Sequence, residues 1–209
     1  NDLLTYTRLQ PSKLGDIKNL GLVTAAQWDH LDNDGNAELI ITGEWLGIEV
    51  YNCNSGSFVR VSEKFELENM IGWWRSLEVL DVDNDGDKDI VAGNLGLNYK
   101  YKASDEHPFF IYANDFDDNG STDIVLSYEK KGKMLPLRGR QCSSEQVPDI
   151  AKRFETFESF ADASLGQIYG DHKLKEALHY EANTFEHTWF ENDNGSLIAH
   201  SLPRLSQIS

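Results

Sequence analysis

Two nine-residue stretches place oxygen-bearing side chains at regular intervals around a glycine. In Asp81 to Asp89 and in Asp115 to Asp123, positions 1, 3, 5 and 9 carry a carboxylate or an amide, and position 6 is glycine. Alternating oxygens on a tight turn converge on one centre, which suits a hard divalent cation. The sequence therefore predicts two calcium sites. Their side-chain ligands are expected to be Asp81, Asp83, Asp85 and Asp89, and Asp115, Asp117, Asn119 and Asp123.

The alternative for both stretches is a surface turn without metal, because Asn and Asp favour turns in any case. Five aspartates crowd into Asp81 to Asp89, where they would repel one another if no cation were bound. Alternation, glycine and a closing aspartate occur together in both stretches, and this combination favours the metal site.

A third stretch, His30 to Glu38, matches less well. Histidine replaces the first aspartate and glutamate replaces the last. Imidazole nitrogen is a poor calcium ligand beside a carboxylate, although Asp29 lies one residue earlier and could substitute if the turn shifts register. The sequence leaves occupancy of this stretch open. Its candidate metal residues are His30, Asp32, Asp34, Asn36 and Glu38.

None of the three stretches is an EF-hand. That loop needs a bidentate glutamate at position 12 and flanking helices, whereas position 12 here is Ala92, Leu126 or Ile41. Short branched apolar runs follow each stretch instead and predict buried strands.

The repeated stretches also indicate the architecture. Strand, acidic loop, strand and hairpin follow one another, and four short strands per repeat is the composition of a propeller blade. The prediction is an all-β chain of four-stranded antiparallel blades within one propeller-type domain or fragment, residues 1–209. A closed propeller needs about four to eight blades, so a partial propeller from a longer protein is expected. The expected units are 20–65, 70–105, 108–142 and an incomplete 184–209.

Residues 143–179 interrupt the strand pattern and predict an inserted set of short helices. Pro148 suits an early helical position, and Ser164 to Gln167 has the capping-box pattern.

Composition limits the class of protein. The 209 residues carry a net charge of −16, which would repel nucleic acid. No apolar run approaches the ~20 residues of a membrane span, and no signal peptide is visible. Cys53 and Cys142 could pair or stay free. Calcium loops of this kind suit millimolar extracellular calcium, so an extracellular, cell-surface or periplasmic location is expected.

Four segments carry a family resemblance that covers nearly the whole chain. They are TAAQWDHLDNDGNAELIITGEW (24–45), GWWRSLEVLDVDNDGDKDIVAGNLGLN (72–98), RGRQCSSEQVPDIAKRF (138–154) and HYEANTFEHTWFENDNGS (179–196). The chain resembles the FG-GAP/VCBS repeats of integrin-type β-propellers, and most closely the secreted ASPIC/UnbV and cartilage-acidic-protein group. This resemblance implies structural calcium between the first two strands of each blade, with the backbone carbonyls of Asp87 and Ser121 completing the two shells. It implies no catalytic mechanism.

Two other surface features are candidates for binding. Trp73, Trp74 and Arg75 could form a sugar-stacking platform, although blade packing explains the tryptophans as well. A basic cluster, Lys130, Lys131, Lys133, Arg138 and Arg140, could bind an acidic glycan, although a solvated hairpin turn is favoured there.

The predicted function is an exported, calcium-stabilised, non-catalytic β-propeller module that binds an extracellular protein or glycan. Exposed blade edges would permit oligomer formation. The alternative is a carbohydrate-active enzyme or its ancillary domain. That alternative needs a concave pocket with converging carboxylates, and Glu44, Glu145 and Glu181 are recommended only by their residue type.

Overall fold

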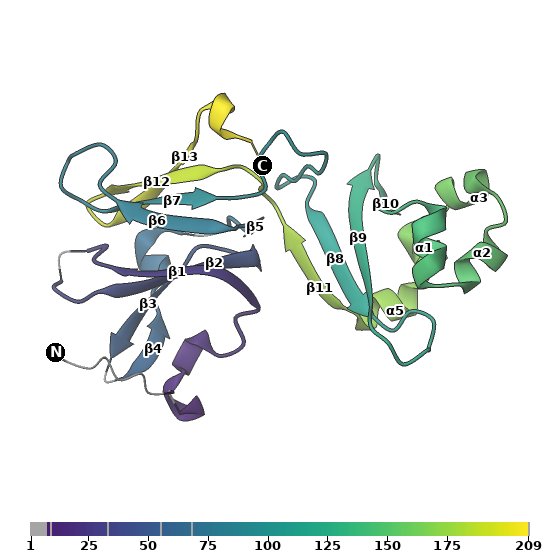
Figure 1. Cartoon of the computed structure of the whole chain (residues 1–209), viewed down its shortest axis with the longest axis horizontal. Coiled ribbons are helices and arrows are strands. Elements are labelled where there is room, and N and C mark those ends of the chain that lie inside the picture. Colours follow the sequence, from purple (N-terminus) through teal and green to yellow (C-terminus); the bar gives the residue numbers. More distant parts are fainter. Residues whose placement is uncertain (1–7, 9, 33, 55, 68, 209) are drawn as a thin grey trace, which may run out of the picture. The chain divides into compact units, whose positions relative to one another are not determined.

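The computed structural model describes the chain except residues 1–7, 9, 33, 55, 68 and 209. It divides into two compact units (Figure 1). Unit 1 comprises residues 1–100 and 185–209, and unit 2 comprises residues 101–184. Unit 2 is therefore inserted into the chain of unit 1.

The first sheet of unit 1 is an antiparallel meander with one added strand. Its path is β1 (Leu22–Asp29), β2 (Glu38–Leu46), β3 (Glu49–Asn54) and β4 (Ser57–Arg60), and β5 (Gly72–Trp73) also pairs with β2. Three short 3-10 helices flank it, namely η1 (Pro11–Lys13), η2 (Gly15–Ile17) and η3 (Ser62–Phe65).

The second sheet of unit 1 combines strands from both parts of the chain. Its order is β13 (Ser196–Ser201), β12 (Thr188–Asp193), β7 (Asp89–Gly93) and β6 (Ser76–Leu80), and η4 (Arg204–Ser206) follows it. The sequence places 70–105 and 184–209 in separate blade units, but β12 pairs with β7, with Thr188 opposite Ala92. Without this pairing, the side of β7 that faces away from β6 would lack hydrogen-bond partners.

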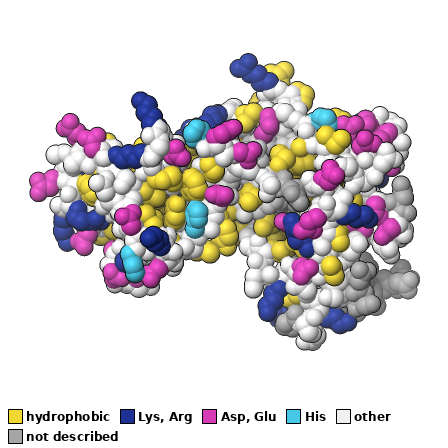
Figure 2. All heavy atoms as spheres, turned by 180° about the vertical axis from the view of Figure 1, so that it is seen from behind, with side chains coloured by type: hydrophobic (Ala, Val, Ile, Leu, Met, Phe, Trp, Pro, Cys, Tyr) yellow, Lys and Arg dark blue, Asp and Glu magenta, His cyan; other side chains and the backbone are white. Residues whose placement is uncertain are grey.

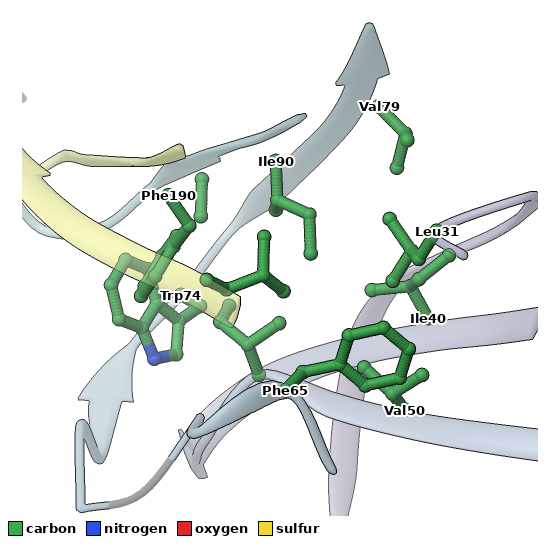
Figure 3. Close-up of a cluster of buried hydrophobic side chains, with 11 residues drawn as sticks. Leu31, Ile40, Val50, Phe65, Trp74, Val79, Ile90 and Phe190 are labelled. Carbon is green, nitrogen blue, oxygen red and sulfur yellow. The ribbon is translucent and has the colours of Figure 1, made fainter. Parts of the chain in front are cut away.

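A core cluster joins the two sheets of unit 1 (Figure 3). Ile40 and Val50 come from the first sheet, while Ile90 and Phe190 come from the second, and all four are at most 1% exposed. Ile41 and Tyr51, next to Ile40 and Val50 in sequence, belong to a separate cluster. Successive strand residues point to opposite faces, so the continuous apolar run in β2 supplies both clusters.

Unit 2 contains one four-stranded sheet and five short helices. The sheet order is β10 (Lys133–Pro136), β9 (Asp123–Lys130), β8 (Phe109–Asn114) and β11 (Leu178–Ala182). The helices are α1 (Arg140–Gln146), α2 (Asp149–Arg153), α3 (Phe157–Ala161), α4 (Leu165–Tyr169) and α5 (Asp171–Glu176). The capping box that begins α4 is present as predicted, because Ser164 accepts from the backbone N–H of Gln167 and Gln167 accepts in return.

The helices pack against one face of the unit 2 sheet. Val125 of β9 shares a buried cluster with Ile150 of α2. Ile124, Leu178 and Tyr180 are 42%, 58% and 46% exposed. Figure 2 shows hydrophobic side chains at the surface of unit 2.

The predicted fold class is confirmed. The chain is mostly β, built from antiparallel sheets that resemble propeller blades, with a set of short helices between β10 and β11. Both cysteines, Cys53 and Cys142, are exposed and free. Within the described part of the chain, no helix has the length and apolarity to cross a bilayer.

Candidate metal centres

Each acidic stretch connects the first two strands of its sheet. Loop 1 (residues 30–38) joins β1 to β2, loop 2 (81–89) joins β6 to β7, and loop 3 (115–123) joins β8 to β9. Asn33 of loop 1 lies outside the described residues. In all three loops, position 9 is the first residue of the second strand, so the pairing of the two strands fixes where its carboxylate lies.

The position 9 carboxylate makes the same hydrogen bond in every loop. One of its oxygens accepts the backbone N–H of position 2. The donor and acceptor residues are Leu31 and Glu38 (3.0 Å), Val82 and Asp89 (2.8 Å), and Phe116 and Asp123 (2.9 Å). All three acceptors are buried, at 0%, 1% and 4% exposure. This bond closes the loop and holds a charged oxygen at its base.

The position 1 aspartates of loops 2 and 3 fold back onto the turn. Asp81 accepts the N–H of Asn84 at 2.7 Å and of Gly86 at 3.2 Å. Asp115 accepts the N–H of Gly120 at 2.7 Å. Gly86 and Gly120 have φ of 104° and 85°, a left-handed conformation in which a side chain would be strained. The glycine at position 6 is therefore required by the turn itself.

Three carboxylates converge in each of these loops. The ligand oxygens of Asp81, Asp83 and Asp89 lie within 4.8 Å of one another, as do those of Asp115, Asp117 and Asp123. Among the described residues, no Lys, Arg or His forms an ion pair with any aspartate of loop 2. Close carboxylates that form no ion pair with a cationic side chain fit Ca2+, which prefers oxygen ligands.

Loop 3 provides a second sign of a cation site. The Oδ1 atom of Asp117 is buried and has no hydrogen-bond partner among the described residues. A buried carboxylate oxygen without a partner is costly, and a bound cation would satisfy it.

The pKa values of these groups reflect the crowding. Burial raises the pKa of Asp123 above 3.8, and the nearby charge of Asp117 raises it further. The pKa of Asp83 is also raised, first by desolvation and then by its carboxylate neighbours, which include Asp85 and Asp89. The pKa of Asp115 is lowered, chiefly by the N–H of Gly120. Asp83 and Asp123 thus hold protons more firmly in the absence of a metal than they would in the unfolded chain.

The remaining predicted ligands lie beside these groups. At position 5, Asp85 accepts the N–H of Asp87 at 2.9 Å, and Asn119 accepts the N–H of Ser121 at 2.7 Å. Asp85 is not among the three converging carboxylates of loop 2. The full ligand sets, including the carbonyls of Asp87 and Ser121, therefore remain predictions.

Loop 1 brings together a different set. Asp32, Asp34 and Glu38 converge within 4.8 Å. His30 instead contacts the carbonyl oxygen of Asn36 through Nδ1, at 2.8 Å. Asp29 accepts the backbone N–H of His30 at 2.9 Å and is not among the converging residues.

Lys64, at η3, forms an ion pair with Asp32 of loop 1. Burial is the largest single effect and raises the pKa of Asp32, but the hydrogen bond from Lys64, the hydrogen bonds from Asp34 and the charge of Lys64 together outweigh it, so the net shift is downward. The pKa of Lys64 is raised, first by that bond and also by the charges of Asp34 and Glu38. Lys64 therefore lies in the field of the whole group. Local sequence around loop 1 gave no indication of it.

Asn192 of β12 is a second residue that the sequence did not reveal as part of these centres. Its backbone N–H donates to Oδ1 of Asp89 at 2.8 Å. Its side-chain amide donates to the carbonyls of Leu31 at 2.8 Å and of Lys88 at 2.9 Å, while its Oδ1 accepts the N–H of Gly195 at 2.8 Å. A tight turn follows Asp193 and leads into β13, because Asp193 pairs with Ser196.

The tryptophan platform needs a correction. Trp74 is fully buried in the core cluster, and its indole N–H donates to the carbonyl of Met70 at 3.3 Å, so its ring is closed to a ligand. Trp73 packs against Trp45, with ring centroids 5.5 Å apart, and the guanidinium of Arg75 lies 5.7 Å from the centroid of Trp73. Trp73 ends β5 and Trp74 follows the strand, and the two rings have different surroundings.

The basic cluster is partly used by the fold. Arg140 donates to the carbonyls of Phe154 and Ala151, and Lys133 donates to the carbonyl of Asp162. Lys130 closes β9, and Lys133 opens β10 after a tight turn, as the hairpin interpretation predicted.

Unit 1 contains a hollow of about 520 Å³, lined partly by Glu49, Arg60 and Glu63. Arg60 forms ion pairs with both glutamates. Glu44, Glu145 and Glu181 do not line this hollow. Glu66 also lines the hollow, and it accepts a hydrogen bond from the hydroxyl of Ser196 at 2.9 Å.

Comparison with known families gives a match over part of the chain. Residues 30–92 match the family model of the FG-GAP-like repeat. This segment is similar to the FG-GAP-like repeat. The matched segment runs from loop 1 into β7, whereas loop 3 lies outside the match and has the same local geometry. No curated protein and no solved structure matches the chain.

Proposed function

We propose that this FG-GAP-like repeat protein is an extracellular binding module whose acidic loops are stabilised by calcium and which performs no catalysis. One observation carries the proposal. Loops 2 and 3 each bring three aspartate carboxylates within 4.8 Å of one another at the junction of two strands.

Calcium would act on stability in this account. Bound calcium would supply positive charge to the converging carboxylates and oppose their mutual repulsion. The residues that would hold it include Asp81, Asp83 and Asp89 in loop 2, and Asp115, Asp117 and Asp123 in loop 3. Because position 9 begins the second strand of the sheet, an ordered loop also fixes the start of that strand.

The binding role rests on the repeat family and on the surface. FG-GAP-like repeats are often found in extracellular interaction proteins, and the closer likeness to the ASPIC/UnbV group belongs to this proposal. Exposed apolar residues of unit 2, namely Ile124, Leu178 and Tyr180, offer contact area for a protein partner or a second copy. Glycan binding and protein binding are separable by a glycan array and by sedimentation, each with and without calcium.

Calorimetric titration with calcium tests the metal centres directly. Asp83→Asn changes a converging carboxylate and should abolish binding at loop 2. The matched control is Asp87→Asn in the same loop, because only the backbone carbonyl of Asp87 is an expected ligand. The control makes the same change in charge and should keep the site. Equal losses in both variants would mean that general charge, and not coordination, governs binding.

Loop 3 allows the same comparison. Asp117→Asn should remove its site, while Asp118→Asn should preserve it, because Asp118 pairs with Lys173 at 2.6 Å and does not converge with the other three. Absence of calcium binding in the unaltered protein at millimolar calcium would refute the proposed metal centres.

A further inference from the structure

Loop 1 differs from loops 2 and 3 because a cationic side chain of the protein already contacts it. Lys64 forms an ion pair with Asp32, one of the three converging residues. Its ammonium nitrogen lies 5.5 Å from the ring centroid of Phe65, which is fully buried. The helical turn η3, anchored by Phe65, therefore brings the ammonium to the loop.

A second donor occupies another oxygen of loop 1. His30 lies 2.8 Å from the carbonyl of Asn36 through Nδ1, and because a carbonyl only accepts, the imidazole donates. In loops 2 and 3 the corresponding position 7 residues are Asp87 and Ser121, whose carbonyls are expected calcium ligands. In loop 1 the imidazole engages that oxygen.

The carboxylate group of loop 1 nevertheless requires a positive charge. Glu38 is 0% exposed, and its Oε1 atom has no hydrogen-bond partner among the described residues. Asp32 and Asp34 lie close to it, with ligand oxygens within 4.8 Å. A buried carboxylate with two anionic neighbours needs a counter-ion nearby.

We propose that the ammonium of Lys64 is the built-in cation of loop 1, so that the native loop is neutralised by the protein and is not a calcium site. The comparison with calcium in loops 2 and 3 rests on the proposed function. On this basis, loop 1 has His30 at position 1 and Glu38 at position 9, where loops 2 and 3 have aspartate, because a lysine and not a metal neutralises it.

Loop 3 shows that a nearby lysine alone does not produce this effect. Lys173 donates to the backbone carbonyl of Asp115 at 2.8 Å and pairs with Asp118. Neither contact uses a carboxylate of the converging group, Asp115, Asp117 and Asp123. Lys64, in contrast, pairs with a carboxylate of the group itself.

Removal of the ammonium should therefore create a calcium site. The test measures the number of calcium ions bound to the full chain by calorimetry and by equilibrium dialysis with metal analysis. The variants are Lys64→Met, Lys64→Gln as a second neutral replacement, and Lys64→Arg, which keeps the charge. Lys18→Met is the matched control, because it removes one positive charge at an exposed residue of unit 1. Circular dichroism checks that each variant folds, and Lys64→Gln serves if Lys64→Met does not.

The expected result is two calcium ions for the unaltered protein, Lys64→Arg and Lys18→Met, and three for the neutral Lys64 variants. If the unaltered protein binds a third ion weakly, the neutral variants should bind it at least about tenfold more tightly. Adding Asp32→Asn to Lys64→Met should remove the third ion and so assign it to loop 1.

Each other outcome is decisive. Three ions of unchanged affinity in the unaltered protein and in Lys64→Met would overturn the role of Lys64 and leave the calcium proposal for loops 2 and 3 intact. A gain of one ion from a starting value of zero would support Lys64 and refute calcium in loops 2 and 3. If neither neutral variant gains a bound ion or binds a third ion more tightly, the inference is overturned.

Discussion

The backbone N–H of Asn192 donates to Oδ1 of Asp89 at 2.8 Å, which attaches β12 to the base of loop 2. The side-chain amide of the same asparagine donates to the carbonyl of Leu31 in loop 1, also at 2.8 Å. Asn192 is 1% exposed. Strand β12, from the C-terminal part of the chain, therefore connects loop 1 and loop 2 through hydrogen bonds.

Replacement of Asn192 should destabilise unit 1. Asn192→Asp keeps the shape of the side chain but cannot donate to the carbonyls of Leu31 and Lys88, and it adds a negative charge beside Asp89. Asn192→Ala leaves the same carbonyls and the N–H of Gly195 without partners. We expect a loss of about 2–4 kcal/mol in the free energy of unfolding for each, measured by urea denaturation. A loss below about 1 kcal/mol would show that water replaces these bonds.

The two adjacent tryptophans should differ in their effect on stability. Trp74 is 0% exposed and packs against Phe190, with ring centroids 6.2 Å apart. Trp74→Ala should therefore lower the free energy of unfolding by about 3–5 kcal/mol. Trp73→Ala serves as the comparison, because Trp73 is only partly buried, and its loss should be smaller. An equal or larger loss for Trp73→Ala would contradict the assignment of Trp74 to the core.

The buried phenol of Tyr51 should make the stability of the folded state fall at alkaline pH. Burial raises the pKa of its phenol from 10.0 to about 12, and the charge of Glu49 adds to this. The folded state therefore favours the neutral phenol, so the stability from Tyr51 is full below pH 10.0 and is lost as the pH rises through about 12. Tyr51→Phe cannot ionise and should lose less stability over this range.

The check for Tyr51 is chemical denaturation at several alkaline pH values, with phenolate absorbance followed in parallel. Tyr51→Phe and the unaltered protein should have similar stability at neutral pH. Identical alkaline curves for the two proteins would show that Tyr51 ionises as freely in the folded state as in the unfolded chain.

Local features of the fold could be predicted from sequence. The glycine of each acidic loop, the strand that follows the loop and the capping box at Ser164 all depend on neighbouring residues. The converging aspartates of loops 2 and 3 were predicted for the same reason, because their spacing on one turn determines where their oxygens lie.

Long-range contacts could not be read in this way. The pairing of β12 with β7 joins strands that are separated in sequence by all of unit 2. No local sequence pattern shows that β7, and not another strand, is the partner of β12. Nothing in the local sequence around Lys64 or Asn192 indicates that either residue contacts an acidic loop. They become part of the acidic loops only because η3 and β12 pack beside them. The burial of Trp74 likewise depends on which face of its segment meets the second sheet.

Thermal unfolding with and without calcium tests the central claim most directly. With free calcium at about 100 times its dissociation constant, the folded state gains about 2.7 kcal/mol per site, so EDTA should lower Tm by on the order of 5–10 °C for each site. Added calcium should restore the original value, and magnesium should restore less of it. A Tm that stays within about 1 °C on chelation would contradict the account, because the converging aspartates would then be stable without a metal.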